Sequence, residues 1–163
     1  MSKIEIKKST HEDVEYIREW LKDPETLQWY PMSNDREIED AALFWISFVK
    51  YGAVLTAYYN DEVAGIINLY LQPYQKFSHQ CLMAIIVKNG FRGKGIGTKL
   101  IQEIGKCAKE KFNVKFLHLE VYENNPAIRL YEREGFIKFG EHKHFIKNLD
   151  GSYLSKIFMQ KQL

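Results

Sequence analysis

The chain has 163 residues, of which 45% are hydrophobic, 14% aromatic and 27% charged, and this composition excludes disordered and collagen-like proteins. A net charge of +2 argues against bulk nucleic-acid binding. No apolar run approaches the roughly 20 residues of a membrane span, and the N-terminus lacks the apolar core of a signal peptide. We therefore expect one cytoplasmic domain over residues 1–163, with neither nucleic acid nor membrane as a partner.

Periodicity and capping predict a mixture of strands and helices. Alternation at Ile4 and Ile6 is typical of a short strand, and Asn60-Asp61-Glu62 is typical of a hairpin turn. In chain order we predict a strand at 4–6, helices at about 11–22 and 35–50 around an aromatic loop at 27–32, strands at 53–59, 63–71 and 80–88, a helix to about 112, a strand at 116–122, a helix ending at Gly135, and strands at 136–147 and 153–160. This order predicts an α/β (mixed α+β) fold with a central mixed sheet covered by helices.

The charges are unevenly distributed along the chain. Residues 88–111 hold seven Lys or Arg against two Glu, whereas residues 11–40 hold ten Asp or Glu against three Lys or Arg. Two solvated helix faces would explain this pattern. A site with one pole for an anion and another for a cation would explain it equally well, and the acidic pole would then favour a cationic substrate.

The strongest local feature is a glycine-rich turn between a strand and a helix, with the sequence Arg92-Gly93-Lys94-Gly95-Ile96-Gly97. A helix start presents unpaired N–H groups and a partial positive charge, and glycines let a bound group approach the backbone closely. The turn therefore predicts an anion cradle, most often one for phosphate. The spacing matches neither a Walker loop nor the dinucleotide Gly-x-Gly-x-x-Gly motif.

These residues resemble the acetyl-CoA signature Arg/Gln-x-x-Gly-x-Gly/Ala of the GCN5-related N-acetyltransferase (GNAT) superfamily. A second block resembles that family's Asn-x-x-Ala-x-x-Leu-Tyr-x-x-x-Gly-Phe motif and reads Asn124-Asn125-Pro126-Ala127-Ile128-Arg129-Leu130-Tyr131-Glu132-Arg133-Glu134-Gly135-Phe136. The two blocks occur in the family's order, and the predicted elements fit the family across nearly the whole chain. The resemblance implies a GNAT fold with a mostly antiparallel sheet and transfer of an acetyl group from acetyl-CoA to a primary amine.

The resemblance also implies a role for individual residues in binding the cofactor. Backbone groups of Ile85, Ile86 and Val87 would pair with the pantetheine arm. The pyrophosphate would be held by the turn and the first residues of the helix, namely Arg92, Gly93, Lys94, Gly95, Ile96, Gly97 and Thr98. Asn124 would hydrogen-bond the pantetheine or position it. Pro126 suits the first helical position and makes Asn125 the N-cap, which leaves the Asn124 side chain free for a ligand.

The catalytic groups are expected on the last strand–helix unit. Tyr131 aligns with the family's general acid, and the alternative is an aromatic residue on an amphipathic helix. Glu120 lies in a Leu-Glu-Val context resembling that of the base in some relatives, although the link to the Asn motif is one residue shorter here. The alternative is a solvated or ion-paired carboxylate, with a water chain acting as the base.

Other side chains give weaker evidence for a functional role. Trp29, Tyr30 and Met32 lie where the family forms one wall of the acceptor site, and packing is an equally good explanation. No metal is expected, because the His118/Glu120 and His142/His144 pairs lack a metal-ligand context. Cys81 and Cys107 are expected to fill core space.

Three questions stay open at the level of sequence. A non-catalytic acyl-CoA-binding module and an enzyme using another acyl-CoA are alternatives to an acetyltransferase. The acceptor amine, small molecule or protein, is not identified, because specificity lies in variable loops. The chain could act as a monomer or as a homodimer.

Overall fold

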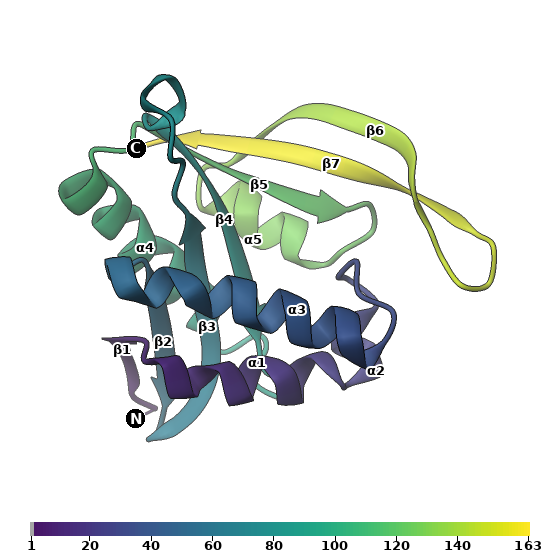
Figure 1. The fold of residues 1–163 in the computed structure, drawn as a ribbon, viewed down its shortest axis with the longest axis horizontal. Helices are drawn as coiled ribbons and strands as arrows, with labels where there is room; N and C mark the ends of the chain where they lie inside the picture. The colour runs from purple at the N-terminus through teal and green to yellow at the C-terminus, as the bar shows by residue number, and fades with distance from the viewer. Residues whose placement is uncertain (1) are drawn as a thin grey trace.

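The computed structural model describes residues 2–163 (Figure 1). Its elements in chain order are β1 (Ile4–Lys8), α1 (Val14–Leu21), α2 (Pro24–Leu27), α3 (Asp35–Ile46), β2 (Val54–Tyr59), β3 (Glu62–Tyr70), β4 (Gln80–Val87), α4 (Ile96–Phe112), β5 (Phe116–Tyr122), α5 (Ala127–Arg133), β6 (Ile137–Lys147) and β7 (Tyr153–Gln162). Three short 3-10 helices occupy His11–Asp13, Ser47–Tyr51 and Gln75–Phe77. The predicted order of long elements is confirmed.

Two local differences have simple causes. A short helix that was not predicted, α2, begins at the Asp23-Pro24 pair directly after α1, because the Asp23 side chain accepts a hydrogen bond from the Glu25 N–H and proline suits a first helical turn. The second predicted helix, 35–50, changes at Ser47 from an α-helix to a 3-10 helix, which ends at Gly52 with a φ of 69°.

The strands form one seven-stranded sheet in the order β1-β2-β3-β4-β5-β7-β6. All neighbours are antiparallel except β4 and β5, which run parallel, so the predicted mixed and mostly antiparallel sheet is confirmed. β4 and β5 pair only between residues 80–82 and 116–118. Both strands continue beyond these pairs, so the sheet opens between their C-terminal halves.

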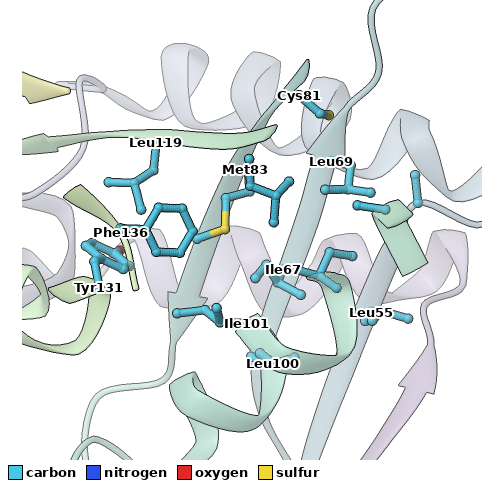
Figure 2. Packing of buried hydrophobic residues seen from close by; sticks show 14 of the residues in the cluster. Leu55, Ile67, Leu69, Cys81, Met83, Leu100, Ile101, Leu119, Tyr131 and Phe136 are labelled. Carbon is cyan, nitrogen blue, oxygen red and sulfur yellow. The ribbon is translucent and has the colours of Figure 1, made fainter. Parts of the chain in front are cut away.

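Two apolar cores cover the two faces of the sheet. The helices α1 and α3 pack on one face, where Ile17, Leu21 and Ile66 are fully buried. The helices α4 and α5 pack on the other face, in a cluster that Figure 2 shows from close by. Gly65 lets α4 lie close to β3, because a Cβ there would stand 3.0 Å from Leu100 Cδ1. Burial of these side chains supplies most of the stabilisation of the fold.

The last two strands form a hairpin that runs past the ends of the other strands (Figure 1). Its register is interrupted between His142 and Ile146, and His144 has a φ of 57°. The hairpin brings Phe145 and Lys156 towards the opening between β4 and β5. No helix within residues 2–163 is both long enough and apolar enough to cross a membrane.

Candidate active site

The opening between β4 and β5 holds two adjoining cavities, of about 520 Å³ and about 480 Å³. They are called here the loop cavity and the aromatic cavity. Both are lined by the same five residues, Trp29, Tyr30, Ile85, Asn125 and Tyr131. A molecule lying in one cavity can therefore reach a molecule lying in the other at these residues.

The loop cavity ends at the glycine-rich turn. Gly93 and Gly95 have φ angles of 74° and 83°, values that favour glycine over residues with a Cβ. They place the turn at the N-terminus of the 17-residue helix α4, where N–H groups lack helical partners and the helix dipole is positive. The Arg92 guanidinium donates a 3.3 Å hydrogen bond to the Thr26 hydroxyl on α2. The cavity thus combines backbone donors with a positioned cation, as an anion site requires.

The third glycine of the motif has a different role. A Cβ at Gly97 would lie 2.7 Å from Leu130 Cδ2, so this glycine allows α4 and α5 to approach closely. That approach brings Arg129 and Arg133 of α5 to the wall of the loop cavity. Neither arginine is among the predicted site residues, although their spacing of four residues on a helix places them on one face.

Eight of the eleven predicted cofactor residues line the loop cavity: Ile85, Val87, Arg92, Gly93, Gly95, Ile96, Gly97 and Thr98. Three predicted residues lie elsewhere. The Ile86 side chain points into the core beneath α1 and α3, as strand alternation requires. Lys94 lies over the ring of Tyr59, with its Nζ 5.4 Å from the ring centroid.

The third of these residues, Asn124, is exposed, has a φ of 67° and lines neither cavity. Its neighbour Asn125 lines both. The Asn125 side chain accepts a 3.0 Å hydrogen bond from the Ala127 N–H, which is the capping contact predicted from Pro126. The structure therefore brings the capping residue, rather than Asn124, to the meeting point of the cavities.

Tyr30 makes the contact that defines this meeting point. Its hydroxyl donates a 2.6 Å hydrogen bond to the Ile85 carbonyl oxygen. Ile85 lies in the part of β4 that has left β5, so its carbonyl has no strand partner on that side and the tyrosine replaces one. From the sequence, Tyr30 is expected only to line the acceptor site or to pack in the core. No local pattern links it to a strand residue 55 positions away.

Tyr131 lies beside Tyr30 with its ring edge-on to Phe136, the two ring centroids being 6.1 Å apart (Figure 2). Burial raises the pKa of the Tyr131 hydroxyl well above its ordinary value. The pKa of Tyr30 is raised as well, first by burial and then by the neighbouring Tyr131. Both hydroxyls therefore carry their protons at neutral pH. The Tyr30 hydroxyl donates a hydrogen bond to the Ile85 carbonyl oxygen, whereas within residues 2–163 the Tyr131 hydroxyl has no protein hydrogen-bond partner.

The aromatic cavity is lined by Trp29, Tyr30 and Met32, the residues expected to form the acceptor wall. Glu120 lies on its edge and forms a 2.6 Å ion pair with Lys156 of β7. None of the acidic residues within 11–40 lines either cavity in the described chain. Two of these acidic residues, Glu15 and Glu39, instead form ion pairs with Arg18.

The remaining candidate groups have structural partners. The His118 ring bonds the Gln80 side chain, and burial lowers its pKa. Cys81 is buried, which raises its thiol pKa to about 12, so it packs in the core as predicted. Within residues 2–163, no group of three or more His, Cys, Asp or Glu side chains is placed to hold a metal ion.

Comparison with known proteins agrees with the two motifs. The model of the acetyltransferase (GNAT) family matches residues 14–136, which confirms the resemblance. An N-alpha-acetyltransferase of Sulfurisphaera tokodaii is 32% identical over 60% of this chain and 66% of its own length, so the chain spans just under two thirds of that relative. The L-amino acid N-acetyltransferase AaaT of Escherichia coli is 26% identical over 99% of both chains.

A solved structure extends the likeness to the fold. The putative acetyltransferase yncA of Salmonella typhimurium, solved with its cofactor acetyl-CoA, superposes with a TM-score of 0.81. The superposition covers 98% of this chain and 94% of that one at 22% sequence identity. The predicted fold class is therefore confirmed.

Proposed function

The chain belongs to the acetyltransferase (GNAT) family, and from this premise we propose that it is an N-acetyltransferase that transfers the acetyl group of acetyl-CoA directly to a primary amine. The observation that carries the proposal is the meeting of the two cavities at Tyr30, Ile85 and Tyr131. The loop cavity would hold coenzyme A, and the aromatic cavity would hold the acceptor. The thioester would then lie between them, beside the Tyr131 hydroxyl.

Binding of the carrier follows from the groups that line the loop cavity. Backbone N–H groups of residues 93–98 would hold the pyrophosphate, with Arg92 supplying a full charge. The part of β4 that lacks a β5 partner, residues 85–87, would pair with the pantetheine amides as an added strand would. Asn124 retains its predicted contact with the pantetheine only if its side chain turns towards the cavity on binding.

The transfer needs two proton movements. As the amine nitrogen attacks the thioester carbon, a C–N bond forms and the C–S bond breaks. Tyr131 would protonate the leaving thiolate, because it lines both cavities and its hydroxyl has no protein acceptor within residues 2–163, and solvent would then return a proton to the tyrosine. A backbone N–H of β4 would stabilise the negative charge on the carbonyl oxygen.

The amine must lose a proton before or during attack. At pH 7 a lysine-type amine is neutral about once in 2,500 molecules, and an α-amine about once in seven. Glu120 lines the aromatic cavity and is more than one-third exposed, so water can connect it to a bound amine. We assign to it the role of a water-mediated base.

The proposal is tested by calorimetry with coenzyme A and by thiol release from acetyl-CoA with a panel of amines. We expect binding of coenzyme A, together with thiol release that depends on the amine and yields an acetylated product by mass. Binding without release with every amine would favour a non-catalytic acyl-CoA module. A larger rate with propionyl-CoA than with acetyl-CoA would favour another acyl group.

A further inference from the structure

The aromatic cavity has an unusual lining for a site that accepts an amine. Of its 20 lining residues only two, Glu120 and Lys156, carry a charge. Eight others are aromatic: Trp29, Tyr30, Phe44, Trp45, Tyr70, Tyr122, Tyr131 and Phe145. The cavity is therefore an apolar chamber with one carboxylate and one ammonium group at its edge.

Two of these eight aromatic rings are stacked against each other. The rings of Phe44 and Tyr70 are stacked, with centroids 5.4 Å apart and planes 16° apart. Burial raises the pKa of Tyr70 to about 12, so this hydroxyl stays neutral and adds no charge. Phe44 is exposed at 59%, which leaves its ring available to a ligand. Such rings stabilise a large apolar group, because aromatic surfaces lose much water-accessible area on contact.

The two charged groups are held in place. The Glu120 carboxylate lies 2.6 Å from Lys156 Nζ, and this ammonium group lies 4.2 Å from the centroid of the Phe145 ring. Only 17% of the Lys156 side chain is exposed, so its charge is partly desolvated. The ammonium can donate three hydrogen bonds, and within residues 2–163 Glu120 is its one acidic partner.

Charge balance then restricts the acceptor. A polyamine would bring several positive charges to a cavity whose formal charge is zero, and uncompensated charge in an apolar site is costly. A zwitterion brings one ammonium for Glu120 and one carboxylate for Lys156, so every charge keeps a partner. The volume of about 480 Å³ lies within the usual range for small-molecule sites.

We propose that the acceptor is an α-amino acid with a large apolar or aromatic side chain. Its amino group would face Glu120 across a bridging water molecule, its carboxylate would lie against Lys156, and its side chain would lie between the aromatic residues. The inference rests on the proposed function, since it places the acceptor in the cavity that adjoins the coenzyme A site. It also gives the β6–β7 hairpin a role in specificity, because Phe145 and Lys156 both come from it.

Four acceptors test the substrate class: L-phenylalanine, phenethylamine, glycine and spermidine, each with acetyl-CoA in a thiol-release assay. We expect kcat/KM to be at least tenfold higher for phenylalanine than for each of the other three. Phenethylamine or glycine within twofold of phenylalanine would overturn the inference, and so would spermidine as the best substrate. In these cases thiol release itself upholds the proposed function, whereas no release with any amine removes both.

Lys156→Met tests the carboxylate contact while keeping an apolar stem over Phe145. We expect KM for phenylalanine to rise at least tenfold and KM for phenethylamine to stay within twofold. The matched control is Lys147→Met, because Lys147 lies on the same hairpin over the ring of Tyr153 and lines neither cavity. An equal loss with both substrates would show that Lys156 acts through packing and would refute the assignment.

Discussion

Gly93→Ala tests whether the glycine-rich turn binds the diphosphate of coenzyme A. Gly93 has a φ of 74°, and an added Cβ would meet no protein atom within 4 Å. The only cost to the folded protein is therefore the left-handed backbone, about 1–2 kcal/mol for a residue with a Cβ. Gly93 lines the loop cavity, so we expect the added methyl group to obstruct a bound phosphate.

Gly90→Ala is the matched control. Gly90 has a φ of 89° and equally open space, but it lines neither cavity. Urea denaturation should show the same loss of about 1–2 kcal/mol in the free energy of unfolding for both variants. Calorimetry should show weaker binding of coenzyme A by Gly93→Ala alone, by at least tenfold, which corresponds to about 1.4 kcal/mol.

Two results would refute this reasoning. If both variants bind coenzyme A as tightly as the unchanged protein, the turn does not hold the ligand. If both lose affinity equally, the loss comes from backbone strain transmitted through the loop. We expect no difference in the free energy of unfolding between the two variants. If one is measured, the affinities for coenzyme A are corrected for the folded fraction of each variant.

Four further predictions concern the two proposed catalytic residues and the apolar core. Tyr131→Phe should lower kcat by about 10²–10⁴ while leaving the KM for acetyl-CoA within twofold, and an unchanged kcat would contradict its role as the acid. Since burial raises the pKa of Tyr131, deprotonation of this acid should cause no fall in kcat up to about pH 10, and a fall near pH 8 would contradict the assignment. Glu120→Gln should lower kcat at pH 7 by a factor that shrinks as the pH rises and the amine itself becomes neutral; a pH-independent deficit would exclude a role as the base. Leu100→Ala should lower the free energy of unfolding by about 2–5 kcal/mol in urea, whereas Ile137→Ala, at an exposed position, should change it by less than about 0.5 kcal/mol.

Local chemistry made several features predictable. The turn before α4 needs positive φ at Gly93 and Gly95, and Pro126 needs a capping residue before it, so the residue types alone indicate both structures. These two features lie in the motifs that identified the family, which is why the fold and the loop cavity followed from them. The nearly continuous apolar residues of β3 and β4 are likewise typical of strands that are covered on both faces.

Contacts between distant residues were not predictable in this way. The bond from Tyr30 to the Ile85 carbonyl exists because β4 leaves β5, and no residue pattern in either strand signals that separation. The exposed position of Asn124 is also set by the path of the chain into α5, where Asn125 takes the cap. The charge run at residues 11–40 suggested an acidic pole, yet folding directs those side chains away from both cavities.

The amino-acid sequence alone determined the class of the protein and the turn at which an anion is expected to bind, because backbone conformation at glycine and proline depends on neighbours along the chain. The composition of the aromatic cavity was decided only by the tertiary structure. Its aromatic residues and its paired charges come from the loop after α2, from α3, β3, β5 and α5, and from the β6–β7 hairpin, and they meet only when the sheet is assembled. Hydrophobic burial that drives this assembly is not directional, so it leaves no local mark on the residues that it brings together.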